Sequence, residues 1–209
     1  MPVFSGINLQ VKAGECLALN GHSGSGKSSL LRCLYGNYGA SSGEVRIRHQ
    51  NLWFSLSNAE PREVVEVRRR TMGYVSQFLR VIPRVSTLDI VAEPLRRLGV
   101  AYDDARRQAQ TLLERLNLPE RLWSLPPATF SGGEQQRVNI AHGLIAGQPV
   151  LLLDEPTASL DADNRRVVVE LIHAARERGA AVIGIFHDDE VRSAVASRTF
   201  DVEHHHPIL

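Results

Sequence analysis

Gly21-His22-Ser23-Gly24-Ser25-Gly26-Lys27-Ser28 is the stretch that decides the expected fold of this 209-residue chain. It lies between an apolar run typical of a buried strand, residues 15–19, and a segment with helical periodicity, residues 27–34. Glycines at these positions let the backbone curl so that its N–H groups point inward, and the start of the helix adds the positive end of a dipole. The stretch fits the P-loop pattern and therefore predicts a phosphate-binding loop.

The last residues of this loop suit a nucleoside triphosphate bound with magnesium. Lys27 would supply a point charge to the β- and γ-phosphates, and the Ser28 hydroxyl would reach Mg²⁺. A glycine-rich turn that binds nothing is the alternative, and the strand–helix context disfavours it. The residues expected to bind the nucleotide are Gly21, His22, Ser23, Gly24, Ser25, Gly26, Lys27, Ser28 and Ser29.

Composition narrows the class of protein. Hydrophobic residues make up 43% of the chain, which is enough for a packed core. The formal net charge of +1 gives no overall basic field, so no nucleic-acid partner is expected. Cys16 and Cys33 in a chain without a secretory leader favour a reduced, cytoplasmic setting. No apolar stretch approaches the ~18 residues of a membrane helix, so any membrane role is expected to come through a partner.

Strands and helices alternate over most of the chain. Strands are expected at residues 3–11, 72–76, 150–153 and 181–186, with a hairpin at 43–49 and 52–56. Helices are expected at residues 61–70, 161–178 and from 188 onward. Such alternation is typical of a mainly parallel sheet that is covered by helices on both faces.

Residues 78–147 have a different, helical character. Amphipathic helices are expected near 87–98 and 103–116, with stops at Pro83, Pro94, Gly99, Pro119 and Pro126-Pro127. The predicted fold class is therefore α/β, a P-loop NTPase core with a mainly parallel sheet and a small N-terminal antiparallel β region. Residues 78–147 are expected to insert a helical subdomain into this single domain, which spans residues 1–209.

Two carboxylates, Asp154 and Glu155, follow the apolar run at residues 150–153. The carboxyl end of a buried parallel strand lies beside the P-loop, at the edge where such sheets bind ligands. Asp154 could then hold Mg²⁺, directly or through water, and Glu155 could orient or deprotonate the attacking water, a role worth roughly 10² to 10⁴ in rate. An acidic strand end can also be a plain helix cap, and the P-loop favours the catalytic interpretation.

A second glycine-containing motif follows Phe130. Ser131 is expected to cap a helix that opens with Gly132 and Gly133 and runs to about residue 145. This would make a second anion-binding helix end, far from the P-loop in sequence. A plain helix cap remains the alternative on these residues alone.

The combined motifs resemble the ABC ATPase family. Ser131 to Gln135 matches the family signature, usually Leu-Ser-Gly-Gly-Gln, with Phe130 in place of leucine and Glu134 in place of the usual glutamine. The matches occur in the family's order and cover essentially the whole chain, so the resemblance implies a single ABC ATPase domain.

Three further positions match this family. Gln77 matches the glutamine of the Q-loop, residues 159–161 match the D-loop, and His187 matches the switch histidine. The resemblance implies Glu155, His187 and Gln77 as catalytic residues. Ser28, Gln77 and Asp154 would hold the metal. Beyond the P-loop, the implied nucleotide contacts are Ser131, Gly132, Gly133, Glu134, Gln135 and Asp161.

The resemblance also implies how the protein works. ABC subunits pair head to tail with two ATP molecules between them. The P-loop of one subunit holds each ATP, and Ser131 of the partner subunit would cover its γ-phosphate together with the two glycines that follow. ATP and Mg²⁺ are thus the implied cofactors, and ATP would stabilise the closed dimer.

Within this family the chain resembles the L-subunit group of the bacterial phosphonate carbon–phosphorus lyase system. The stretches that carry this resemblance are residues 34–38, 73–85, 115–123 and 129–141. It implies a role in phosphonate catabolism, at the synthesis of ribose 1-methylphosphonate 5-triphosphate. The implied partners are the carbon–phosphorus lyase core complex and a second ABC subunit, in a homodimer or a heterodimer. Two other interpretations stay open, the nucleotide-binding subunit of a lipoprotein-release exporter and an ATP-dependent clamp with negligible hydrolysis.

Some features depart from the family pattern or carry weaker hypotheses. The family's extra N-terminal strand and its adenine-stacking aromatic residue are not found, Phe4 does not match convincingly, and a misplaced start codon is the favoured explanation. His142 stands where the group carries arginine, with an unknown effect on the dimer interface. The run 68–70 of three arginines is expected on a solvated helix face rather than against an acidic partner. The three histidines at 204–206 are expected in a mobile tail rather than a metal site.

Overall fold

A five-stranded parallel sheet forms the centre of the protein in the computed structural model, which describes residues 4–79 and 83–203. The strand order is β4-β5-β6-β1-β7, and every neighbouring pair in it is parallel. This confirms the predicted α/β fold with a mainly parallel sheet. The strands are β1 Cys16–Asn20, β4 Met72–Val75, β5 Val150–Asp154, β6 Ala181–Ile185 and β7 Arg198–Asp201.

The side chains of β1 alternate between the two faces of this sheet, and both faces are buried. Cys16 and Ala18 pack into one hydrophobic cluster, and Leu17 and Leu19 pack into another on the opposite face. Each leucine buried in this way stabilises the fold by about 1.5–3 kcal/mol. The second cluster is covered by α1 (Lys27–Leu34), and the first is covered by α5 (Gly132–Leu144) and α6 (Ala162–Glu177).

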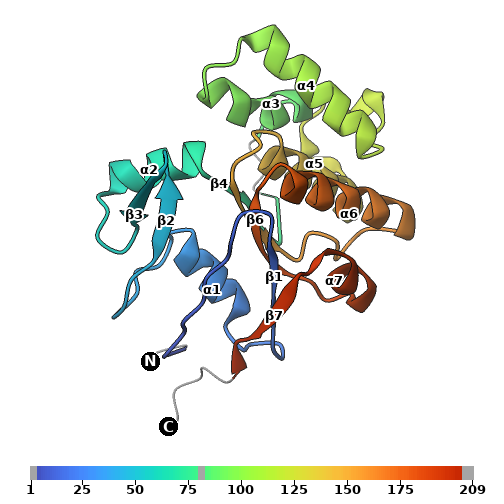
Figure 1. Ribbon diagram of the computed structural model, residues 1–209. Helices are drawn as coiled ribbons and strands as arrows, with labels where there is room; N and C mark the ends of the chain where they lie inside the picture. The colour runs from blue at the N-terminus through green and yellow to red at the C-terminus, as the bar shows by residue number, and fades with distance from the viewer. Residues whose placement is uncertain (1–3, 80–82, 204–209) are drawn as a thin grey trace.

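A small antiparallel pair lies beside this sheet next to α2 (Figure 1). The strands β2 (Arg46–His49) and β3 (Leu52–Ser55) form the predicted hairpin, and α2 spans Pro61–Arg70. Gln50 and Asn51 join the two strands with positive φ values of 48° and 67°, as a tight primed turn requires. The antiparallel part of the fold prediction is therefore confirmed at this hairpin.

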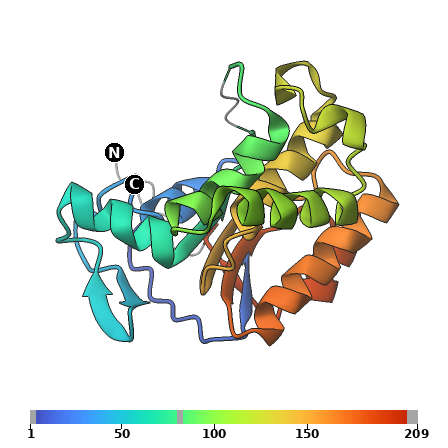
Figure 2. The ribbon, with the colours of Figure 1, turned by 90° about the horizontal axis from the view of Figure 1, so that it is seen from above.

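Helices fill the segment between β4 and β5. They are α3 (Thr87–Arg97), α4 (Tyr102–Arg115) and α5, with short 3₁₀ turns at Glu120–Leu122 and Pro127–Thr129. Figure 2, seen from above, shows these helices (green to yellow) lying between α2 and α6. The predicted stop at Pro94 is wrong, because Pro94 lies inside α3. Burial of one face of α3, including Ile90, Val91 and Leu95, outweighs the hydrogen bond that the proline cannot donate.

One predicted strand is absent from the described residues, and one observed strand was not predicted. The alternating segment at residues 3–11 forms no strand over its described part, residues 4–11, and Val3 lies outside the described residues. Its apolar side chains pack against the sheet, and Gly6 has a φ of 66°, which is incompatible with an extended ladder. Strand β7 was not predicted from the sequence. It pairs with β1 at the sheet edge and follows α7 (Asp189–Val195), which comes after β6 in the chain.

Candidate nucleotide-binding site

Residues 21–28 form an open loop at the carboxyl end of β1. Gly21, Gly24 and Gly26 have φ values of 140°, 86° and 90°, a region that side chains other than glycine rarely adopt. Gly26 caps α1 without a side-chain hydrogen bond, so the first N–H groups of α1 are left for another acceptor. Lys27 is 8% exposed, and its Nζ donates to the carbonyls of Gly21 and His22 at 2.7 and 2.8 Å.

This loop fits a phosphate group. In the described part of the chain, Lys27 forms no ion pair with a carboxylate, so its charge is available beside the uncapped start of α1. The hydroxyl of Ser25 is buried and has no hydrogen-bond partner among the described residues. A cation, an open helix N-terminus and an unsatisfied buried hydroxyl together favour an anionic ligand at this position.

Oxygen ligands suited to magnesium lie between the P-loop and β5. Ser28 Oγ donates to Oδ1 of Asp154 at 3.0 Å, and Tyr74 Oη donates to Oδ2 at 3.3 Å. Asp154 is 1% exposed, and this burial raises its pKa above the usual range, although the Ser28 hydrogen bond opposes the shift. A bound divalent cation would offset the cost of burying this carboxylate, and a hydroxyl with a carboxylate is a donor set that Mg²⁺ accepts.

The three predicted catalytic residues meet at Glu155. His187 Nε2 lies 2.7 Å from Glu155 Oε1, and Gln77 Nε2 donates to Glu155 Oε2 at 3.3 Å. These residues follow the carboxyl ends of β6, β4 and β5, which explains why segments far apart in sequence converge here. The structure thus brings Gln77, Glu155 and His187 together as expected.

Glu155 itself has an unusual backbone. Its φ of 53° is left-handed, a conformation that costs a non-glycine residue roughly 1–3 kcal/mol and is enriched at functional sites. The surrounding structure holds it there, because its N–H donates to the Ile185 carbonyl at 3.2 Å. Gln136, on α5, donates from Nε2 to the carbonyl of Pro156 at 3.0 Å and braces the same loop.

Two residues of this site were missed from the sequence. Tyr74 holds Asp154, and Gln136 holds the loop after Glu155. The burial of Gln136, which is 5% exposed, is seen only in the structure. Tyr74 carried no signal in the sequence, because an aromatic residue in a strand is ordinary core composition.

Ser131 caps α5 as predicted and forms a capping box with Glu134. The Ser131 N–H donates to Glu134 Oε2 at 2.8 Å, the Ser131 hydroxyl donates to the same oxygen at 2.8 Å, and the Glu134 N–H lies 3.3 Å from Ser131 Oγ. The Ser131 hydroxyl holds the pKa of Glu134 below its usual range. The residue that replaces the family's glutamine is therefore a charged carboxylate at the start of this helix. Gln135 also bonds locally, to the Phe130 carbonyl at 3.1 Å.

The signature motif packs against the residues that precede α6. A Cβ added to Gly133 would lie 2.9 Å from the Ser159 carbonyl oxygen, whereas one added to Gly132 would have its nearest neighbour at 3.9 Å. Asp161 caps α6 and accepts from the Asn164 N–H at 2.8 Å, which lowers the pKa of Asp161. In the part of the chain that the structure describes, no hydrogen bond joins Ser131, Gly132 or Gly133 to the P-loop.

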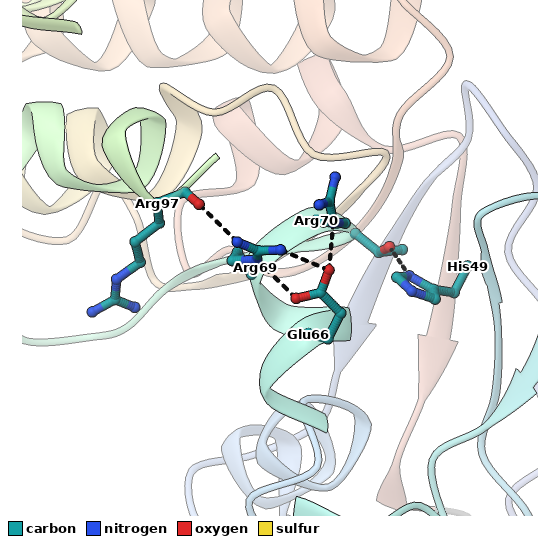
Figure 3. A network of polar contacts seen from close by, with 6 residues as sticks. His49, Glu66, Arg69, Arg70 and Arg97 are labelled. Atoms are coloured by element: carbon teal, nitrogen blue, oxygen red, sulfur yellow. Dashed lines mark hydrogen bonds and ion pairs between the residues drawn. The ribbon is translucent and has the colours of Figure 1, made fainter. Parts of the chain in front are cut away.

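The arginine run at 68–70 makes contacts inside the chain. Glu66 accepts hydrogen bonds from both Arg69 and Arg70, and Arg69 Nη1 donates to the Arg97 carbonyl at 3.0 Å, as Figure 3 shows. Arg68 stacks over Tyr35, with Cζ 4.4 Å from the ring centroid. The expectation that these arginines lie on a solvated helix face is thus only partly met, because Arg69 also joins α2 to the end of α3.

His142 lies in the helical segment rather than beside the catalytic cluster. Its Nε2 is 3.8 Å from Oε2 of Glu93, so it links α5 to α3. Burial raises the pKa of Glu93, but His142 and Arg97 together have the larger opposite effect, so the pKa lies below its usual value. The three histidines at 204–206 lie outside the described residues.

A P-loop, a buried aspartate beside it and a glutamate at the next position define a P-loop nucleotide hydrolase. The family model described as "ABC transporter" matches residues 4–158, which is more than half of the chain. The chain therefore belongs to the ABC transporter family of ATPases, as the sequence motifs predicted. Among the described residues, no helix has the length and hydrophobicity needed to cross a membrane.

Several relatives and solved structures are similar to this chain. The lipoprotein-releasing system ATP-binding protein LolD of Maricaulis maris is 40% identical over 192 residues, 91% of this chain and 82% of that protein. The macrolide export ATP-binding/permease protein MacB of Escherichia coli K12 is 36% identical over 200 residues, but this chain spans only 30% of its length. The ABC transporter ATP-binding protein YtrE of Bacillus subtilis is 36% identical over 194 residues, 92% of this chain and 82% of that protein.

Two solved structures of the cassette MJ0796 share the fold. A dimeric form superposes with a TM-score of 0.87 at 29% identity, covering 96% of this chain and 87% of that one. A dimeric post-hydrolysis state bound to ADP and Pi superposes with a TM-score of 0.86 at 30% identity, with the same coverage. The P-loop ABC ATPase fold of this chain is thereby established.

Proposed function

We propose that this chain hydrolyses MgATP as one half of a head-to-tail dimer, in which ATP closes the two subunits and hydrolysis releases them. The observation that carries this proposal is the separation of two half-sites within one chain. The P-loop and the Glu155 cluster converge at the sheet edge, while Ser131 and its two glycines form a second helix N-terminus with no hydrogen bond to the P-loop among the described residues. The dimeric state of both similar cassettes supports the pairing.

In this proposal the P-loop grips the triphosphate. Lys27 and the first N–H groups of α1 face the β- and γ-phosphates, and Ser28 with Asp154 holds the metal. The metal that these two side chains would hold would supply positive charge that neutralises the phosphates. Gln77, which already reaches the same cluster, supplies a further oxygen ligand toward the metal and the attacking water.

Glu155 acts as the base that accepts a proton from the attacking water. Two donors from different elements hold its carboxylate, so its position is fixed before the reaction. His187 contacts the γ-phosphate from the same edge, with its Nε2 hydrogen bonded to Glu155. Ser131 of the partner subunit covers the γ-phosphate and so excludes all water molecules except the one that attacks.

Formation of the dimer follows from the charge of ATP and from the coupling of ATP binding to subunit pairing. A triphosphate carries several negative charges, and neither helix N-terminus of one chain can surround it alone. A ligand that binds the closed pair better than the open one shifts the equilibrium toward the closed pair by its difference in affinity. Cleavage of the γ-phosphate removes the contact that joins the half-sites, and the pair reopens.

The assembly that this ATPase drives has two candidates, and the comparisons favour the first. A membrane permease of the lipoprotein-releasing or macrolide-export kind is supported by 40% identity to LolD over most of both chains and by 36% identity to MacB over 30% of its length. In this role the chain is a nucleotide-binding subunit, and its partner supplies the membrane segments.

The carbon–phosphorus lyase core complex is the second candidate. The observation that favours it is the altered signature, in which Phe130 and Glu134 replace the family's usual residues as they do in the L-subunit group. Both replacements fit this structure, because Phe130 is 8% exposed in the main core and Glu134 completes the capping box. Here the chain takes part in ribose 1-methylphosphonate 5-triphosphate synthesis by ATP-driven dimerisation, and sister subunits supply the chemistry on the nucleoside.

One experiment separates the two candidates. A tagged chain is purified from its native cells after growth in phosphate-limited and phosphate-rich media, with detergent-solubilised membranes included. Recovery of integral membrane permeases in both media supports the exporter assignment. Recovery of carbon–phosphorus lyase subunits in the phosphate-limited culture alone supports the second candidate. Phosphate release by the purified chain separates both from a clamp with negligible hydrolysis.

A further inference from the structure

An ion pair joins the start of α6 to the residue that follows His187. Arg165 lies one turn into α6, and its Nη1 contacts Oδ2 of Asp188, which caps α7. The two side chains are 36% and 25% exposed, so the pair is more sheltered from solvent and salt than an ordinary surface pair. Figure 1 shows α7 beside α6.

Asp188 is held at both carboxylate oxygens. Oδ1 accepts from the N–H groups of Glu190 and Val191 at 2.9 and 3.2 Å, and Oδ2 accepts from Arg165. The hydrogen bond from Val191 is the main reason that the pKa of Asp188 is lowered, and Arg165 lowers it further against the effect of burial. A residue constrained in this way fixes its neighbour, and that neighbour is His187.

Arg165 is also connected to the residues that precede α6. Its N–H donates to the carbonyl of Asp161 at 2.9 Å, in the first turn of the helix. The charges of Arg137, on the signature helix, and of Arg165 both act on Asp161, after the larger effect of the Asn164 N–H on its pKa. The bond from the Arg165 N–H is an ordinary helical backbone bond, so it fixes Arg165 in the first turn of α6, while the guanidinium group reaches the loop of His187.

We infer that Arg165 is a positioning residue, which holds His187 against Glu155 through Asp188 and ties that geometry to the start of α6. The inference rests on the proposed catalytic role of His187. Arg165 does not contact the P-loop among the described residues, so its loss should change kcat and leave the KM for ATP nearly unaltered. A displaced catalytic group costs up to ~10²-fold in rate. Loss of a partly exposed ion pair displaces the loop only part of the time, so Arg165→Ala should lower kcat by about tenfold.

A double-mutant cycle tests this role against a merely structural one. Phosphate release is measured for the wild type, Arg165→Ala, His187→Ala and the double variant. If Arg165 acts through His187, Arg165→Ala lowers kcat in the wild-type background and has no further effect once His187 is absent. Asp188→Asn, which keeps the helix cap but removes the charge, should reproduce the loss, and Arg165→Lys should restore part of it.

Arg166 provides the matched control. It lies next to Arg165 on α6 and pairs with Asp163, with both side chains 77% exposed, so Arg166→Ala should leave kcat unchanged. Thermal unfolding of each variant shows whether the fold is retained. An unaltered kcat in both Arg165→Ala and Asp188→Asn, or an equal loss with and without His187, would overturn the positioning role. Undiminished turnover in His187→Ala would instead contradict the proposed function, and the positioning role with it.

Discussion

Glu155 Oε1 lies 2.7 Å from Nε2 of His187, in a cluster that draws together the ends of β5 and β6. The carboxylate has a second donor in Gln77 and a strained left-handed backbone that the neighbouring strand holds in place. Strain maintained at a carboxylate with two fixed donors is expected of a preorganised base.

Glu155→Gln should nearly abolish turnover while ATP still binds. Glutamine keeps the size and one of the two acceptor oxygens but cannot accept a proton from water, and the loss of a general base costs roughly 10² to 10⁴ in kcat. Phosphate release and binding of a fluorescent ATP analogue measure the two quantities separately. Glu114→Gln, an exposed change on α4, serves as the control. Turnover within a factor of two of the wild type would show that another group is the base.

Asp154→Asn should stabilise the protein without nucleotide and remove the stabilisation that magnesium provides. Burial raises the pKa of Asp154 in the folded chain, so its ionised form costs stability at neutral pH. The stability associated with its protonation is fully present below the unfolded pKa and is lost as pH rises through the folded value. Melting temperatures at pH 5 and pH 8 measure this slope, which should be shallower in Asp154→Asn. A variant that melts lower than the wild type at pH 8 would contradict the buried-charge account.

Gly133→Ala should destabilise the protein more than Gly132→Ala. The added methyl group would lie 2.9 Å from the backbone oxygen of Ser159 in the first case and 3.9 Å from its nearest neighbour in the second. Overpacking against backbone costs about 1–3 kcal/mol, or a fall in melting temperature of roughly 2–4 °C per kcal/mol at this chain length. Thermal unfolding without nucleotide measures the difference. Equal melting temperatures would show that the contact between the signature and Ser159 relaxes freely.

Much of this arrangement was predictable because the motifs occur at strand ends. The P-loop, Asp154, Glu155 and His187 each follow an apolar run, and parallel strands bring their carboxyl ends to one edge. Strand β7 was not predictable, since residues 198–201 carry no apolar alternation and form a strand only because β1 offers a free edge. Residues 4–11 show the reverse, because their alternation buries side chains without any partner for a backbone ladder.

Among site residues, contacts across the chain were the hardest to predict. Tyr74 and Gln136 act through hydrogen bonds to residues 80 and 20 positions away, and no local sequence pattern identifies the partner of either residue. The pairing of Arg165 with Asp188 has the same origin. Local motifs thus predict the candidate reacting residues, and the fold decides which residues hold them.

Glu134→Gln should strengthen ATP-dependent pairing. The Glu134 carboxylate sits at the helix start that would cover the γ-phosphate of the opposite subunit, and its lowered pKa keeps it charged well below neutral pH. The variant removes one negative charge that would repel the phosphates of ATP. The ATP concentration for half-maximal pairing should therefore fall several-fold, which corresponds to about 1 kcal/mol of binding free energy. The effect should be smaller at high salt, because ions screen the repulsion. Titration of pairing with ATP at low and high salt measures this. An unaltered midpoint at low salt would place Glu134 away from the shared phosphate.

The molecular mass of Glu155→Gln with MgATP tests the composite site most directly. Light scattering during size-exclusion chromatography should give the mass of one 23.1 kDa chain without nucleotide and twice that mass with MgATP. Lys27→Ala in the same background should stay monomeric, because the P-loop no longer grips the triphosphate. A single-chain mass for Glu155→Gln at saturating MgATP, with binding of ATP confirmed in the same sample, would contradict the proposal that ATP closes a head-to-tail dimer.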